Sequence, residues 1–375
     1  MTPSPPSTLP TDTRLDLIDR AREAVLHARQ EVPTPWLDPM IERSWRRCLS
    51  QGFEPDRRVE FDAVGPGAQR RALDASQPLL QAAGPVIQSL ARAMLHTRYF
   101  AMLTDARGTV IEVSGPVDRQ NPHAAAIARV GVDLSEAAVG TTAIGTTLAE
   151  QQSVWLHRGE HFFRDTSVFS CAGAPIRGPL GECVGMLDLT GVDVAEQPAL
   201  RHLVTQAARG IENAMVLAAP HRLLLRLNWP GRVLGDDTDG LVCLDGDGRV
   251  TALNRSAAEM LSVRPRLGQQ PGHAADLFAV PFDTLFDAAR QQRGSLEVPL
   301  WSGLRIQVLA RQPDMARGRT HAASAGSGQG GVPLRDLETS LIRKAVADAR
   351  GNVMEAARAL GISRATVYRK LRGPR

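Results

Sequence analysis

One short motif in this sequence could perform metal chemistry. His157, Glu160 and His161 form the pattern H-x-x-E-H, in which two histidines can ligate zinc and the glutamate can act as a general base. Such a site needs both histidines on one face of a stable helix, with a third ligand further along the chain. The preceding letters SVWL indicate a strand instead, and Gly159 weakens a helix. We therefore predict no metal site and no cofactor, and a zinc hydrolase stays a remote alternative.

The last part of the chain concentrates positive charge. Residues 334–375 contain ten Lys or Arg and four Asp or Glu, a net charge of +6, whereas the rest of the chain carries −2. Each phosphate that a basic side chain neutralises releases condensed counterions, so clustered positive charge favours binding to nucleic acid. We expect double-stranded DNA to be the partner of this segment.

Three predicted helices would position these charges. Apolar residues fall on one face of residues 334–346, and Gly351 ends this first helix. A short second helix over 353–360 leads to a turn at Gly361, and Ser363 caps a third helix whose N-terminal end can enter a major groove. The residues predicted to contact DNA are Ser363, Arg364, Ala365, Thr366, Tyr368, Arg369 and Lys370.

The letters GNVMEAARALGISRATVYRKL within this segment resemble the Fis-type helix-turn-helix. The shared features are the Gly-Asn opening, the Ala-Ala pair, the Leu-Gly-Ile-Ser turn and the Tyr-Arg-Lys-Leu ending. The resemblance implies that the first helix pairs with its copy in a second chain. A homodimer on a two-fold symmetric DNA site is the expected assembly.

The remaining residues are numerous enough for two or three domains, because single cores usually split at this length. Hydrophobic residues at 43% and charged residues at 22% are typical of folded globular proteins. Mixed helices and antiparallel hairpins predict a multidomain α+β fold. The expected parts are a disordered tail and helical region over 1–76, a sensor domain over 77–220, a second over 221–312, a Gly/Ser-rich linker over 313–333, and the all-α DNA-binding domain over 334–375.

The N-terminal region is predicted to hold two helices. The first spans residues 15–29, and the second, over 36–49, places Ile41, Trp45 and Leu49 at four-residue spacing on one face. We expect this face to dock on the rest of the protein.

Composition also bears on the compartment. No run approaches the roughly 20 apolar residues that span a bilayer, and the first residues lack the pattern of a signal peptide. Four scattered cysteines without a C-x-x-C pair are expected to remain thiols. We predict a cytoplasmic protein without a membrane partner.

Four stretches in the centre resemble the GAF domain of acetoin-catabolism regulators and related sigma-54 activators. They are VGTTAIGTTLAE, GEHFF, FSCAGAPI and GMLDLTG, with IERSWRRC upstream. DGLVCLDGDGRVTALNRSAAEML is similar to a PAS domain. The resemblance implies an effector pocket in the GAF-like domain, for which the candidates are Thr141, Thr142, His161 and Cys171. The alternative is that the two threonines cap a helix and Cys171 fills the core.

The sequence departs from that family between sensor and DNA-binding segment. Full activators carry an ATPase domain there, whereas this chain has only the predicted linker, and G-x-x-x-x-G-K-[ST] occurs nowhere. We expect neither ATPase activity nor a catalytic residue, which also disfavours a phosphodiesterase or histidine kinase that carries similar sensors. The sequence predicts a DNA-binding transcription regulator controlled by a small effector of unknown identity. The alternative is an interaction protein that competes with full-length activators, which are further candidate partners together with RNA polymerase.

Overall fold

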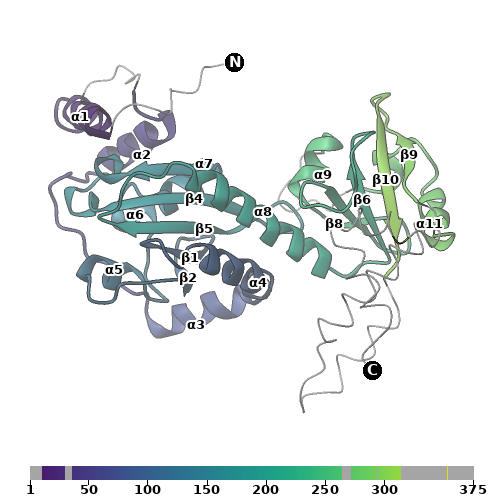
Figure 1. Ribbon diagram of the computed structural model, residues 1–375, viewed down its shortest axis with the longest axis horizontal. Coiled ribbons are helices and arrows are strands. Elements are labelled where there is room, and N and C mark those ends of the chain that lie inside the picture. Colours follow the sequence, from purple (N-terminus) through teal and green to yellow (C-terminus); the bar gives the residue numbers. More distant parts are fainter. Residues whose placement is uncertain (1–10, 30–35, 264–271, 293, 314–352, 354–375) are drawn as a thin grey trace, which may run out of the picture. The chain divides into compact units, whose positions relative to one another are not determined.

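A computed structural model describes residues 11–29, 36–263, 272–292, 294–313 and 353 (Figure 1). The elements below all belong to the unit formed by residues 1–313. The predicted N-terminal tail, the linker beyond Pro313 and every residue predicted to contact DNA lie outside the described residues.

The N-terminal helices pack with one apolar face inward. They are α1 (Thr11–Arg22), the π-helical turn η1 (Glu23–His27) and α2 (Pro39–Ser50). Asp38 caps α2 by accepting a 2.8 Å hydrogen bond from the Met40 backbone nitrogen. Ile41 and Trp45 are fully buried, as the four-residue spacing predicts, while Cys48 rather than Leu49 completes the buried face.

A five-stranded antiparallel sheet forms the centre of the sensor region, in the order β2-β1-β5-β4-β3. Its strands are β1 (Tyr99–Asp105), β2 (Val110–Ser114), β3 (Val154–His157), β4 (Phe169–Arg177) and β5 (Cys183–Val192). The helices around it are α3 (Pro66–Ala75), α4 (Gln77–Ala93), α5 (Pro122–Ile127), α6 (Glu136–Val139), α7 (Ala143–Glu150) and α8 (Leu200–Ala218), with short 3-10 turns η2 (Arg158–Glu160) and η3 (Arg164–Thr166).

The two faces of this sheet belong to different cores, because side chains alternate along each strand. On β5, Leu187 and Leu189 pack with α4 and α8. Met186 points to the opposite face and packs with α2 and with the wall formed by α6 and α7. Figure 1 shows these two helical layers on either side of the strands. The face that carries Met186 also carries the site described below.

A second five-stranded antiparallel sheet follows, in the order β8-β7-β6-β10-β9. Its elements are β6 (Leu223–Asn228), β7 (Gly240–Leu244), β8 (Val250–Leu253), α9 (Arg255–Met260), α10 (Ala274–Leu277), α11 (Asp283–Arg290), β9 (Leu296–Pro299) and β10 (Arg305–Arg311). Asn254 caps α9 by accepting from the Ala257 backbone nitrogen. The central strand β6 was not expected from the sequence.

The expected α+β architecture with antiparallel hairpins is confirmed for the sensor region. All four cysteines are free, and three of them are buried. Among the described residues, none of the helices combines the length and apolarity that a membrane span requires.

Candidate functional site

A small cavity lies on the α2-side face of the first sheet. Its volume is about 20 Å³, which leaves room for little more than one water molecule. Most of its lining is apolar, and the polar exceptions come from the sheet and the two segments that cover it. The lining residues are Phe61, Met102, Ile127, Leu134, Thr142, Ala143, Ile144, His161, Thr166, Phe169, Cys171, Asp188 and Thr190.

Strand register brings the polar floor of the cavity together. Cys171 on β4 lies directly opposite Thr190 on β5, and Asp188 lies opposite Met102 on β1. The Thr190 hydroxyl is hydrogen-bonded to Asp188 Oδ2 and lies 3.2 Å from Cys171 Sγ. On the other side, Cys171 Sγ is 3.6 Å from His161 Nε2. The four side chains therefore form one contiguous polar chain on an otherwise apolar surface.

Burial favours the neutral forms of these groups. It raises the pKa of Asp188 to about 7, lowers that of His161 to about 4, and raises that of the Cys171 thiol well above its usual range. A thiol that resists ionisation is a poor nucleophile. The polar chain is thus suited to hydrogen bonding rather than to covalent catalysis.

The segment from Glu136 to Glu150 forms one wall. Thr142 caps α7, its Oγ1 accepting from the Gly145 backbone nitrogen at 3.1 Å. Just before it, Gly140 ends α6 with φ of +65°, and a Cβ there would lie 2.7 Å from a ring carbon of Phe163. Only glycine satisfies both conditions without strain. The VGTT sequence therefore shapes this wall through its backbone.

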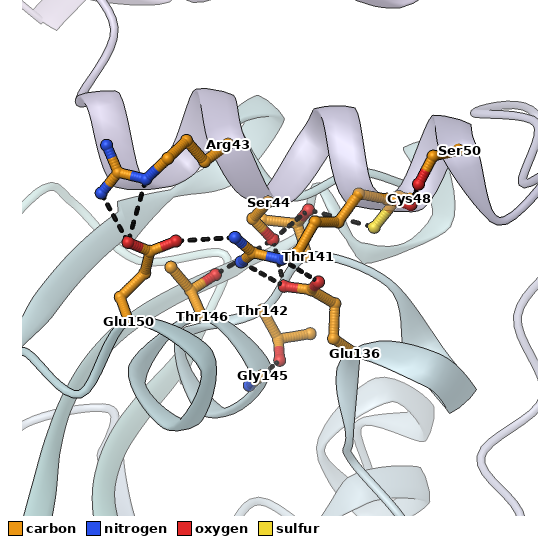
Figure 2. Close-up of polar contacts among 11 residues, drawn as sticks. Arg43, Ser44, Cys48, Ser50, Glu136, Thr141, Thr142, Gly145, Thr146 and Glu150 are labelled. Atoms are coloured by element: carbon orange, nitrogen blue, oxygen red, sulfur yellow. Dashed lines mark hydrogen bonds and ion pairs between the residues drawn. The ribbon is translucent and has the colours of Figure 1, made fainter.

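Helix α2 is fastened to that wall by polar contacts (Figure 2). Arg47 Nε donates to Glu136 Oε1 at 2.6 Å, and Arg47 Nη1 donates to Glu150 Oε1 at 2.7 Å. Arg43 binds the same Glu150 carboxylate through Nε and Nη2. Ser44 Oγ lies 2.8 Å from Thr141 Oγ1. These bonds lower the pKa of Glu150 and raise that of Arg47, so both stay charged.

The segment from Gly159 to Phe163 forms a second wall, to which it contributes His161, and it is held by buried donors. Arg22 Nη1 donates to the carbonyl oxygens of Gly159 at 2.8 Å and His161 at 2.5 Å, and Nη2 donates to that of Phe162. Trp45 Nε1 donates to the Glu160 carbonyl at 2.8 Å. We refer to α1, η1 and α2 together as the N-terminal clamp, because they bind both walls of the cavity.

Three of the four residues predicted for an effector pocket line this cavity. Thr142, His161 and Cys171 are among its lining residues, and Thr142 is also a helix cap. Thr141 lies elsewhere, fully buried against Ser44 and 3.5 Å from Cys48 Sγ.

Sequence reasoning missed the two other polar residues of the floor, Asp188 and Thr190. The signal was present in GMLDLTG, where Asp and Thr at alternate positions of a strand share the face of Met186. An acidic residue that faces a core is rare unless it has a partner or a role.

The H-x-x-E-H residues do not adopt the arrangement of a zinc hydrolase. His157 is on β3 and bonds Ser170 through Nδ1, whereas His161 follows the 3-10 turn η2 and lines the cavity. Glu160 is buried and paired with Arg14 at 2.8 Å. Within the described residues, no three His, Cys, Asp or Glu side chains lie close enough to hold a metal ion.

Comparisons with known proteins match both ends of the chain. Residues 10–213 match the model of the MimR N-terminal domain, and residues 333–372 match that of the Fis family of bacterial regulatory proteins. The acetoin catabolism regulatory protein of Cupriavidus necator is 30% identical over 280 residues, which is 73% of this chain and 41% of that protein.

Two further similarities are more distant. The propane 2-monooxygenase operon transcriptional activator MimR of Mycolicibacterium goodii is 29% identical over 55% of this chain and 34% of its own length. A chain of the E. coli DhaR(N)–DhaL complex is 14% identical with a TM-score of 0.45, covering 74% of this chain and all of that one. This chain spans less than half of the two curated relatives.

The first of these models covers more than half of the chain, and the second covers the basic segment that the sequence singles out. Both relatives are regulators by name. This chain therefore belongs to the family of transcriptional regulators whose sensor region is the MimR N-terminal domain, with a C-terminal Fis-family helix-turn-helix.

Proposed function

We propose that this protein is a sequence-specific, dimeric DNA-binding regulator whose activity is set by a small molecule in the cavity of the first sensor unit. The observation that carries the proposal is that one chain contains both a Fis-family segment and a sensor region with a largely apolar cavity that holds a small cluster of polar groups. Small-molecule sites are typically largely apolar cavities in which a few polar groups converge. Effector binding would change the free energy of one sensor conformation relative to another.

The cavity supports an effector role for Thr142, His161 and Cys171 through hydrogen bonding. Thr141 would act indirectly and without contacting the effector, because it joins the wall of the cavity to Ser44 of the N-terminal clamp. We interpret the first unit as GAF-like and the second as PAS-like, in keeping with the sequence motifs and the two antiparallel sheets. The name of the Cupriavidus relative makes acetoin the first compound to test.

The proposed regulator acts without ATP hydrolysis and is not an enzyme. The P-loop motif whose backbone and lysine hold nucleotide phosphates is absent from the sequence. Full-length protein that has been purified twice should hydrolyse ATP no faster than a buffer blank. ATP hydrolysis that copurifies with the protein would contradict this part of the proposal.

The decisive experiment is in vitro selection of DNA by the full-length protein, followed by binding titrations on the selected site and on a scrambled one. A truncated chain that lacks residues 333–375 is the matched control. We expect the full chain to prefer the selected site and the truncated chain to bind neither DNA. Specific binding by the truncated chain would overturn the assignment of the DNA-binding segment.

A second function is favoured by one observation, namely that this chain matches a sensor-domain model and a Fis-family model but covers only 41% of its Cupriavidus relative. Such a chain could form mixed dimers with full-length activators or compete for their sites. Mixing it with a purified full-length relative would distinguish the two functions. Competition predicts that DNA-bound activator is lost at increasing amounts of this chain, whereas direct regulation requires no second protein.

A further inference from the structure

Asp188 is the most unusual group in the cavity. It is 1% exposed, and its Oδ2 is hydrogen-bonded to Thr190. Its Oδ1 is buried and has no hydrogen-bond partner among the described residues. A buried polar atom without a partner costs free energy, so such an atom in a cavity indicates a place for something that binds there.

The hydrogen-bond donors around Asp188 determine whether a ligand must donate to Oδ1 or accept from it. Thr190 has one hydroxyl hydrogen and two neighbours, Asp188 Oδ2 and Cys171 Sγ. If Asp188 is ionised, Thr190 donates to Oδ2. If Asp188 is protonated on Oδ2, it donates to Thr190, and the Thr190 hydrogen turns to Cys171. A proton on Oδ1 instead would leave a buried O–H without an acceptor and would keep the Thr190 hydrogen on Oδ2, so Cys171 would receive none; this third arrangement therefore makes fewer hydrogen bonds than the second. In the two favoured arrangements Oδ1 is an acceptor without a donor.

The remaining lining limits the ligand further. Aliphatic and aromatic side chains such as Met102, Ile144 and Phe169 surround the polar floor. A cationic amine would lose much more hydration in such a place than a hydroxyl group would. The small volume of the cavity also favours a ligand of few atoms, since every added atom requires the walls to separate further.

We propose that Asp188 is the group that selects the effector, and that it binds a compact, uncharged alcohol whose hydroxyl donates to Oδ1. Thr190 is a positioning residue, because it fixes the carboxyl group through Oδ2. This inference rests on the proposed function, since it assigns the chemistry of the effector to the same cavity. It predicts discrimination between ligands that can donate a hydrogen bond and those that can only accept one.

Three compounds on the same four-carbon skeleton provide the test. 2-Butanol can donate, 2-butanone can only accept, and 2-aminobutane is a cation at neutral pH. Binding of each to the full-length protein is measured by saturation-transfer NMR and by the shift of the melting temperature. We expect 2-butanol to bind at least about tenfold more tightly than the other two, because it alone satisfies Oδ1 without burying a charge.

Substitutions at Asp188 and Thr190 test which residues cause the preference for 2-butanol. Asp188→Leu should abolish the preference for 2-butanol, whereas Asp188→Asn keeps an acceptor of similar shape and should retain binding. Thr190→Val should weaken binding of 2-butanol, and Thr190→Ser should restore it, because only the hydroxyl is needed. Circular dichroism and cooperative urea unfolding show that the sensor region of each variant is folded, and unchanged binding of the selected DNA site shows that the DNA-binding segment is intact.

The outcomes separate this inference from the proposed function. Equal binding of 2-butanone, tighter binding of 2-aminobutane, or an unchanged preference in Asp188→Leu would overturn the role of Asp188. The same holds if none of the three compounds binds to a protein that still recognises its selected DNA. Loss of sequence-selective DNA binding by the unmodified protein would instead overturn the proposed function.

Discussion

Arg47 on α2 donates from Nε to Glu136 Oε1 at 2.6 Å, a bond between residues 89 positions apart in the sequence. With the second bond from Arg47 to Glu150, it ties both ends of the α6–α7 wall to the N-terminal clamp. The clamp and the cavity are therefore mechanically connected. A ligand that separates the walls must also strain or break these contacts.

Replacing Arg47 by Met should loosen this wall. We expect a loss of about 1–2 kcal/mol in the free energy of unfolding, because the ion pairs are partly exposed and screened by solvent. Faster hydrogen exchange within residues 136–150 should accompany it. Arg46→Met is the matched control, since Arg46 bonds Glu42 within its own helix. It should cost about 0.5 kcal/mol or less and leave exchange in the wall unchanged.

Equal effects of the two arginine substitutions would contradict the connection between clamp and wall. Urea denaturation gives the stabilities, and exchange followed by mass spectrometry gives the local effect.

Gly140→Ala should be far more damaging than a similar change at Gly52. Both glycines have positive φ, +65° and +81°. Gly140 also has ψ of −155°, a combination almost confined to glycine that costs another residue about 1–3 kcal/mol. A Cβ at Gly52 meets nothing within 4 Å, whereas one at Gly140 would clash with Phe163. Overpacking adds about 1–3 kcal/mol at the latter position. Thermal unfolding of the two variants measures the difference, and similar melting temperatures would show that the wall yields freely.

Much of the sensor region could be predicted from its sequence because local signals and tertiary packing agree. The turn residues Asp105–Gly108 between β1 and β2, the continuous apolar runs of β4 and β5, and Asn254 before α9 all specify structure within a few residues. The strand β6 was missed because residues 223–228 (LLLRLN) form a short apolar run whose pattern does not distinguish strand from helix. Its position at the centre of a sheet depends on partners far along the chain.

The site was predicted less completely, for a related reason. Thr142, His161 and Cys171 were found through resemblance, but the sequence does not show which of two adjacent threonines faces the cavity. Asp188 was missed because its meaning depends on register: only the pairing of β5 with β4 and β1 shows that it lies on the face with Cys171. The contacts of Arg22 join residues more than 130 positions apart, which no local pattern reveals.

The pH dependence of stability should differ between the unmodified protein and Asp188→Asn. Burial raises the pKa of Asp188 from 3.8 to about 7, so the folded state holds this proton more tightly than the unfolded state. The resulting stabilisation is complete below about pH 4 and is lost as the pH rises through 7. Asp188→Asn has no carboxyl group to deprotonate here, so its stability does not fall in this way. Relative to the unmodified protein, it should gain up to about 1.4 kcal/mol per pH unit across that interval.

Urea denaturation of both proteins at four values between pH 5 and pH 8 provides the measurement. Taking the difference removes the contributions of His157 and His161, whose pKa values are lowered to about 4 by burial. Those histidines act in the opposite direction, since their stabilisation is lost as the pH falls below about 6.5. Parallel curves for the two proteins would show that Asp188 is not buried as described.

The predicted recognition helix offers a test of how the protein reads DNA. Arg364 and Thr366 are expected near its N-terminal end, where side chains reach base edges. Alanine at either position should cost about 1–3 kcal/mol on the selected site and relax the preference at particular base pairs. Arg369 and Lys370 follow a turn later and are expected to contact phosphates. Alanine there should weaken binding to all sequences alike and lower the salt slope by roughly one per contact.

Titrations of the four variants against the selected and the scrambled site, at several salt concentrations, separate the two kinds of contact. Base contacts predict a loss of affinity confined to the selected site, because the two DNAs differ in their bases and share the same phosphate backbone. Phosphate contacts predict equal losses of affinity for both DNAs. These losses shrink as the salt concentration increases, because each released counterion then gains less free energy. If Arg364→Ala and Thr366→Ala weaken both DNAs equally, this helix does not read the sequence, and specificity must come from another part of the chain.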